Sequence, residues 1–227
     1  MPRPLGILRR PAAIGLGLLL TAFVAWAAAD WYRTVPDDAL QHARYVGREA
    51  CIACHQTEYE LWKGSDHDRA MELATDETVL GDFNNAEFTR FDEKTRFFRD
   101  GKKFMVNAEG PDGEYHDYEI KYTFGIRPLQ QYMVEFPDGR VQVLRVSWDV
   151  DKKEWFYVAP SDASQERIEA GDPLHWTGLA QNWNTMCAEC HSTDYHKNYD
   201  LATNTYKSDF FEIDVSCEAC HGPGSLH

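Results

Sequence analysis

All six cysteines of this 227-residue chain occur in one five-residue pattern, Cys-x-x-Cys-His. The first motif spans residues 51–55, the second 187–191 and the third 217–221, and no cysteine lies outside them. The spacing sets two thiols about one helical turn apart, with an imidazole directly after the second thiol. Two thiols so placed bind the vinyl groups of one porphyrin, and the following histidine ligates its iron. The chain is therefore expected to fold around three large, flat cofactors.

The motifs assign nine residues to three covalently attached haem c groups. The attachment residues are Cys51, Cys54, Cys187, Cys190, Cys217 and Cys220, and the proximal iron ligands are His55, His191 and His221. Two alternatives were weighed. A zinc ribbon would use the four cysteines of the second and third motifs but would leave those of the first motif without a partner pair. Three Cys-x-x-Cys disulfides would give no reason for the histidine that follows each pair.

The first 29 residues have the pattern of an export signal. Arg9 and Arg10 precede residues 11–29, which contain no charged side chain, and small residues at 27–29 offer a cleavage site. Residues 11–29 are also just long enough to span a bilayer. We expect residues 1–29 to be either a signal peptide or an N-terminal membrane anchor. Both place the haem motifs in the periplasm, and the anchor would hold the protein at the inner membrane.

The composition is strongly acidic, with 37 Asp and Glu against 23 Lys and Arg and a formal net charge of −14. This charge argues against nucleic acid as a partner. It favours docking of basic redox proteins, and it also keeps a protein soluble without any partner. The aromatic content of 13% suits the flat walls of haem pockets as well as a β-rich core.

The motifs divide the chain into segments of different character. After residues 1–29 we expect a first haem segment over 30–82, a β insertion over 83–158, and a segment with the second and third haems over 159–227. Residues 30–227 are expected to form one domain. The predicted fold class is α+β: a helical multihaem core with an antiparallel β insertion and little regular secondary structure around the haems.

The β insertion is predicted from short aromatic and β-branched runs that alternate with turn signals at residues 100–101, 111–113, 137–139 and 151–153. The expected strands are residues 97–99, 102–107, 115–122, 130–135, 140–148 and 155–158. The hairpin that joins 130–135 to 140–148 through Pro137, Asp138 and Gly139 is the clearest. Around the first motif, the pattern predicts one helix over 49–63, then a capping box at 65–68 that opens a second short helix.

Six histidines remain beside the proximal ones. They are His42, His67, His116, His175, His196 and His227. An iron that only carries electrons needs a sixth ligand. His67 closely follows the first motif, His175 precedes the second, and His227 follows the Gly-Pro-Gly turn after the third, so we predict these three as distal ligands.

Only 25 residues separate the second and third motifs. We therefore expect their haems to be neighbours, and His227 to ligate the haem held by Cys187 and Cys190.

Several stretches are similar to multihaem cytochromes of the cytochrome c-554/c-prime type. The first motif resembles their first haem segment through the residues that follow it, Trp62, Ser65, His67, Ala70 and Met71. Residues 122–125, 128–132, 172–178, 182–187 and 217–224 resemble the branch whose cytochrome domain precedes tetratricopeptide repeats. The resemblance implies periplasmic electron transfer through mostly bis-histidine haems, with His67, His175 and His227 as distal ligands. The chain ends before such repeats, so it is either a fragment of a longer protein or a separate cytochrome module.

We expect an exported multihaem cytochrome c that carries electrons between redox partners through three covalently bound haems. The alternative is a multihaem oxidoreductase in which one open haem acts on a small nitrogen or sulfur oxyanion. A third possibility is a sensor or interaction module whose haems only report the redox state. The histidines distinguish the first two, because an enzyme leaves one iron without a distal ligand.

Overall fold

The computed structural model describes residues 21–26, 29, 42–160 and 166–227. The chain forms two compact units, one of Met1–Arg44 with Ser225–His227 and the other of Tyr45–Gly224. In the first unit, the Ser225 hydroxyl accepts a hydrogen bond from the Arg44 amide (2.8 Å), and the Ser225 amide donates to the Arg44 carbonyl (3.2 Å). The boundaries expected at residues 29, 82 and 158 stay predictions.

Most of the expected signal or anchor lies outside the described residues, since only 21–26 and 29 of it are described. Within the described part of the chain, no helix combines the length and the apolar composition needed to cross a bilayer.

The second unit contains every strand that the structure describes and all three motifs. The helices are α3 (Arg48–Ile52), α4 (Gln56–Trp62), α5 (Trp183–Met186), α6 (Ala188–His191) and α7 (Cys217–His221), with 3-10 turns at Leu179–Gln181 and Gly224–Leu226. The strands are β1 (Met71–Leu73), β2 (Ala86–Arg90), β3 (Glu93–Asp100), β4 (Lys103–Glu109), β5 (Tyr115–Phe124), β6 (Leu129–Glu135), β7 (Val141–Val143), β8 (Val146–Asp149), β9 (Glu154–Tyr157), β10 (Tyr199–Asp200) and β11 (Thr205–Tyr206).

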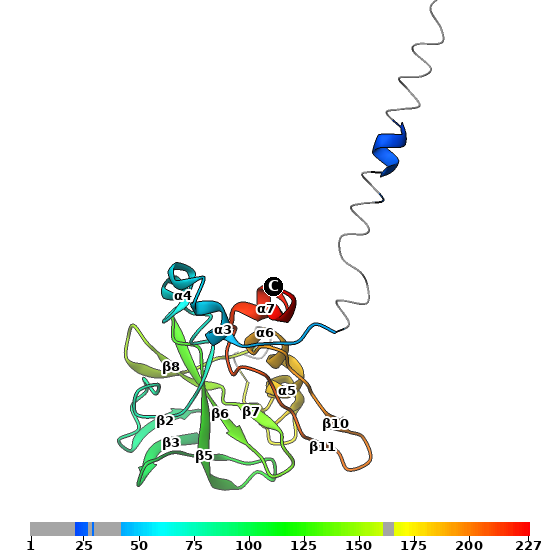
Figure 1. Cartoon of the computed structure of the whole chain (residues 1–227). Coiled ribbons are helices and arrows are strands. Elements are labelled where there is room, and N and C mark those ends of the chain that lie inside the picture. Colours follow the sequence, from blue (N-terminus) through cyan, green and yellow to red (C-terminus); the bar gives the residue numbers. More distant parts are fainter. Residues whose placement is uncertain (1–20, 27–28, 30–41, 161–165) are drawn as a thin grey trace, which may run out of the picture. The chain divides into compact units, whose positions relative to one another are not determined.

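One antiparallel sheet dominates this unit. Its strand order is β2-β3-β4-β5-β6-β8-β9, with β1 paired to β5 and β7 paired to β6. The two ends of this order, β2 and β9, approach each other, so the sheet is curled and nearly closed. Figure 1 shows the motif helices α3, α6 and α7 gathered on one side of the sheet.

The predicted turns connect the strands as expected. Gly101 separates β3 from β4, Gly113 separates β4 from β5, and Gly139 lies in the β6–β7 turn, each with a positive φ that glycine tolerates. Residues 140–148, expected as one strand, form β7 and β8 instead. The chain bends between them at Arg145, whose guanidinium donates to the carbonyls of Leu174 (2.7 Å) and Val158 (3.2 Å).

Two hydrophobic clusters fill the unit. The larger lies inside the sheet, where Phe97 stacks on Trp155 with 3.5 Å between ring centroids. The smaller contains Met71, Met133 and Trp183, and Cys187 packs against it. This second cluster anchors the second motif to the sheet.

The expected mixture of helices and strands is confirmed, but its proportions differ from the prediction. Every described helix is short, and the sheet, predicted as an insertion, is the largest element. The single helix expected over 49–63 is two helices, because His55 leaves the helical conformation (φ −118°, ψ 42°) and begins α4 as its N-cap.

The short helix expected after residue 65 is absent from the described chain. The Ser65 hydroxyl does accept a hydrogen bond from the Asp68 amide (3.3 Å), as a helix cap would. However, Met71 pairs with Phe124 in the sheet, so the chain turns into β1 before a helix can form.

Candidate functional site

Each motif folds as a short helical turn that presents its cysteines in the same way. The Cys54 amide donates to the Cys51 carbonyl (3.2 Å), the Cys190 amide donates to the Cys187 carbonyl (3.1 Å), and the third motif is helix α7 itself. The first cysteine of each pair is half-buried, whereas the second is exposed. All six are free thiols. This donor set fits covalent haem attachment, because both thiols of a pair lie on one turn and the second faces open space.

The first and third motifs touch each other. Helices α3 and α7 pack together, and Cys217 lies near enough to Cys51 to act on its thiol. The Cys51 thiol itself donates to the Gly47 carbonyl (3.8 Å). Burial raises the pKa of the Cys51 thiol, and the neighbouring Cys217 and Glu218 raise it further. The first cysteines of two motifs that are distant in sequence are therefore direct neighbours.

The second motif is linked to the third through Thr193, which follows α6 and is fully buried. Its hydroxyl donates to the Asp214 carbonyl (2.8 Å) and accepts from the Ser216 amide (3.0 Å). Thr193 also forms a β-bridge with Glu212. The residues just before the third motif thus contact both of the other motif regions.

Arg48, in the helix of the first motif, binds the segment before the third motif. Its guanidinium lies 2.6 Å from Glu212 Oε1, 2.5 Å from Asp214 Oδ1 and 3.4 Å from Asp68 Oδ1. The same group stacks over the Trp62 ring at 4.5 Å. Arg48 therefore joins α3, α4 and the start of the third motif in one network.

The carboxyl groups around Arg48 outnumber it. Burial raises the pKa of Asp214 to about 6, and this effect exceeds the opposing effect of the hydrogen bond from Arg48. At Glu212 burial also acts to raise the pKa, but it is outweighed, chiefly by the hydrogen bonds and charge of Arg48, so the pKa is lowered. Burial and the neighbouring carboxylates therefore make Asp214 easier to protonate than Glu212.

Glu218, inside the third motif, provides a second link to the first. Its buried carboxylate accepts hydrogen bonds from the amides of Val46 (3.0 Å), Gly47 (2.7 Å) and Gly224 (2.7 Å). The side chain fixes the residues before α3 and the turn after α7 at the same place.

The three proximal histidines differ in exposure. His55 is exposed at the start of α4, with its Nδ1 3.9 Å from Glu58, and His221 is exposed at the end of α7. His191 is half-buried, its ring centroid lies 4.4 Å from that of Phe124, and burial lowers its pKa. Its Nδ1 is buried and has no hydrogen-bond partner among the described residues.

His67 lies in an exposed turn next to the third motif. Its carbonyl accepts a hydrogen bond from the Val215 amide (3.2 Å), while the Trp62 indole donates to the Val215 carbonyl (3.0 Å).

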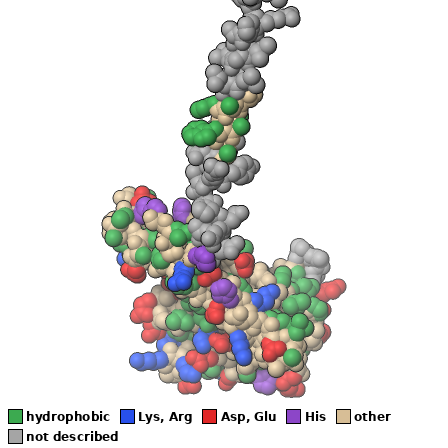
Figure 2. Space-filling model, turned by 45° about the vertical axis from the view of Figure 1, so that its right-hand side comes forward, with side chains coloured by type: hydrophobic (Ala, Val, Ile, Leu, Met, Phe, Trp, Pro, Cys, Tyr) green, Lys and Arg blue, Asp and Glu red, His purple; other side chains and the backbone are tan. Residues whose placement is uncertain are grey.

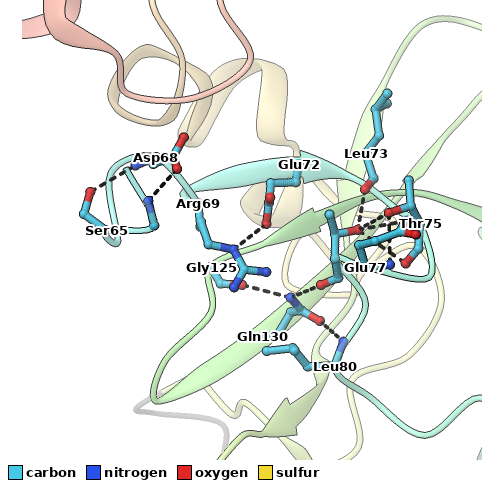
Figure 3. A network of polar contacts seen from close by, with 12 residues as sticks. Ser65, Asp68, Arg69, Glu72, Leu73, Thr75, Glu77, Leu80, Gly125 and Gln130 are labelled. Carbon is cyan, nitrogen blue, oxygen red and sulfur yellow. Dashed lines mark hydrogen bonds and ion pairs between the residues drawn. The ribbon is translucent and has the colours of Figure 1, made fainter. Parts of the chain in front are cut away.

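Figure 3 shows how the residues around this turn are held. Arg69 pairs with Glu72 at 3.0 Å, and Gln130 donates to the carbonyls of Thr78 (3.0 Å) and Gly125 (3.2 Å). The Gln130 side chain also accepts a hydrogen bond from the Leu80 amide (2.8 Å), which ties the chain after the turn to the sheet.

His175 occupies a different environment. Its side chain is 3% exposed, its Nδ1 lies 2.8 Å from the Thr177 hydroxyl, and its Nε2 lies 3.8 Å from Glu109 Oε2. Burial lowers its pKa to about 4, and the charges of Arg145 and Arg167 act in the same direction. None of these neighbours belongs to a Cys-x-x-Cys-His motif, and its role as a haem ligand stays a prediction.

The other histidines are placed as follows. His227 and His42 belong to the first unit, and the role predicted for His227 stays a prediction. His116 pairs with Asp112 at 2.9 Å, and His196 lies 3.4 Å from Asp194.

Sequence reasoning did not find the residues that join the motifs. Arg48, Thr193, Glu212, Asp214 and Glu218 carry no pattern of their own, and each is polar in a segment without clear periodicity. The one available signal was position, because Glu218 lies inside a motif and the other four lie within five residues of one.

Three Cys-x-x-Cys-His turns held together on one side of a sheet characterise a multihaem c-type cytochrome. The family described as "Cytochrome c554 and c-prime" matches residues 50–96 and 155–222, which include all three motifs. The chain belongs to this family. Between the two matched stretches lies most of the sheet.

One solved structure is similar, that of the outer cell wall cytochrome OcwA. The identity is 22% and the TM-score 0.48, and the match covers 81% of this chain and 32% of the OcwA chain. The chain therefore spans about a third of the length of that cytochrome. A search of the curated proteins gave no match.

Proposed function

We propose that this cytochrome is an exported electron carrier that holds three haem c groups through the cysteine pairs 51/54, 187/190 and 217/220. His55, His191 and His221 would be the proximal ligands, with His67 and His227 as distal ligands. The surroundings of His175 favour a different role, developed below, which leaves His42 and His196 as candidates for the third distal position.

The packing of α3 against α7, which sets Cys51 beside Cys217, is the observation that carries this proposal. Each of these cysteines would bind one porphyrin at its edge, so the edges of the first and third haems would lie close together. Haem iron supplies a one-electron couple whose potential is set by its axial ligands. Two such couples held edge to edge suit the passage of electrons along the protein.

The residues around this contact supply rigidity rather than chemistry. Arg48 fixes α3 to the segment before α7, and Glu218 fixes the residues before α3 to the turn after α7. Buried hydrogen bonds and ion pairs of this kind rigidify the groups attached to them. The two attachment points would therefore keep one separation and orientation in both redox states.

The net charge indicates the kind of partner, and the expected export signal indicates the location. On the face shown in Figure 2, acidic side chains are interspersed with basic ones. We infer that the partners are redox proteins, with the net charge of −14 favouring basic ones. The protein would work in the periplasm, with or without an anchor at residues 11–29. The more specific resemblance, to the branch that carries tetratricopeptide repeats, belongs to the same proposal.

Low-temperature electron paramagnetic resonance (EPR) of the oxidised protein tests the proposal. An electron carrier should show three low-spin irons per chain and no change on adding nitrite or hydroxylamine. A stoichiometric high-spin signal that shifts with either compound would overturn it in favour of a catalytic haem.

A further inference from the structure

A cluster apart from the cysteine motifs brings together three side chains that ligate metals. Glu93 is the first residue of β3, Glu109 is the last of β4, and His175 lies in the turn that precedes the second motif. One ligand atom from each lies within 4.8 Å of the others. We propose that Glu93, Glu109 and His175 bind one divalent transition-metal ion of the zinc type.

The burial of the cluster supports this site. His175 is 3% exposed and Glu109 is 5% exposed. Both His175 Nε2 and Glu109 Oε2 are buried without a hydrogen-bond partner among the described residues, and they face each other at 3.8 Å. Buried polar atoms normally find partners, so two that face each other at too great a distance for a hydrogen bond indicate a missing group between them.

Contacts made by the remaining atoms of His175 and Glu109 orient Nε2 and Oε2. His175 Nδ1 is held at 2.8 Å by the Thr177 hydroxyl, which turns Nε2 toward the acids. Glu109 Oε1 is bound by Arg167 at 2.9 Å, which leaves only Oε2 for a ligand. The Trp176 indole donates to the Glu109 carbonyl (2.7 Å) and fixes the end of β4 against the turn. Such outer contacts are those that hold metal ligands in place.

The charges favour a cation. Glu93 and Glu109 bring two carboxylates together, and Arg167 also pairs with Asp92 and Glu169, so its charge is shared. Arg90 adds positive charge near Glu93, but its guanidinium stacks over the Tyr157 ring at 4.1 Å. Arg145 adds positive charge near His175, but its guanidinium donates to the carbonyls of Leu174 and Val158.

The donor set selects the metal. One imidazole and two carboxylates suit zinc-like ions, whereas magnesium and calcium prefer oxygen alone. Zinc bonds of about 2.0–2.2 Å would draw the three ligand atoms together by roughly 1 Å. Three protein ligands leave a fourth position for water, and the ion would link β3 and β4 to the turn before the second motif.

The test uses the purified protein with all its haems attached, so that the cysteines are thioethers and cannot bind zinc. The protein is dialysed against zinc chloride, freed of unbound metal and analysed for zinc and iron. We expect one zinc for three irons, with an unchanged haem spectrum. Glu109→Gln and Glu93→Gln should each weaken zinc binding at least tenfold. The control Asp112→Asn removes an exposed carboxylate that also contacts a histidine, and it should leave zinc binding unchanged.

The site is disproved if the wild-type protein retains no zinc, or if both Gln variants bind it as well as the control does. The variant His175→Ala separates the two roles of this histidine. It should lose zinc and keep its low-spin haems. One new high-spin haem with zinc binding intact would assign His175 to iron and overturn the proposal.

Discussion

Cys51 in α3 lies beside Cys217 in α7, so the first and third haem motifs meet near their first cysteines. The short link between the second and third motifs predicts that their haems are neighbours. In the structure the third motif region contacts both other motif regions, because α7 packs against α3 and Thr193, after α6, is hydrogen-bonded to Asp214 and Ser216.

This contact predicts magnetic coupling between the first and third haems. Replacing Cys187 and Cys190 with Ala should leave a two-haem protein whose oxidised irons interact, which broadens or splits their EPR signals. Replacing Cys217 and Cys220 with Ala removes one partner of the contact and should leave two independent signals. The prediction fails if the second variant shows the stronger interaction.

Arg48 should contribute more to stability than a typical surface arginine. Removing one partner from a buried ion-pair network leaves the other charges without compensation. Because the Arg48 side chain is only 18% exposed, we expect Arg48→Met to lower the free energy of unfolding by about 2–4 kcal/mol. Denaturant unfolding followed by circular dichroism measures this change.

Arg127 is the matched control, because it pairs with Asp66 at 2.5 Å but both side chains are more than half exposed. Exposed ion pairs contribute about 0–1 kcal/mol, so Arg127→Met should have little effect. Equal losses in the two variants would mean that the Arg48 network does not stabilise the junction.

The raised pKa of Asp214 predicts a pH dependence of stability. Its folded pKa of about 6 lies above the unfolded value of about 3.9, so the folded protein binds this proton more tightly. The contribution of this proton to the free energy of unfolding is fully present below about pH 4 and is lost as the pH rises through 6. The change amounts to up to about 2–3 kcal/mol.

Asp214→Asn should remove this contribution, so the difference in unfolding free energy between variant and wild type should change between pH 4 and 6.5. Other carboxyl groups titrate in the same range, but they affect the unfolding free energy of the variant and the wild type equally, so their effect cancels in this difference. A difference that stays constant over the range would contradict the assignment.

His67 and His227 should each be needed for one low-spin iron. Replacing either with Ala removes a strong-field sixth ligand, so one haem per chain should become high-spin while all haems stay attached. His116→Ala is the control, because His116 is engaged with Asp112 and should leave the EPR spectrum unchanged. Three unchanged low-spin signals in His227→Ala would shift the assignment to His196 or His42.

The sequence predicts best the features that depend on local chemistry. The motifs and the turns at Gly101, Gly113 and Gly139 follow from rules that span a few residues, and the family match and the positive φ angles agree with them. The strand β2 was missed because Ala86–Arg90 is mostly polar and only one of its faces is buried.

The relations between distant segments could not be predicted. Nothing near Arg48 shows that it will meet Asp214, and nothing near Glu109 shows that its carboxylate will face His175. These contacts depend on how the sheet brings its ends and turns together, which a single sequence does not encode in any local pattern. The break at His55 was missed for a similar reason, because the helical periodicity continues through it.

The mass of the denatured mature protein tests the central claim most directly. With all six cysteines used for attachment, the protein should keep its haem colour after denaturation and exceed the polypeptide mass by three haem groups. A colourless product that contains zinc, made in a host with complete haem-attachment machinery, would contradict the account.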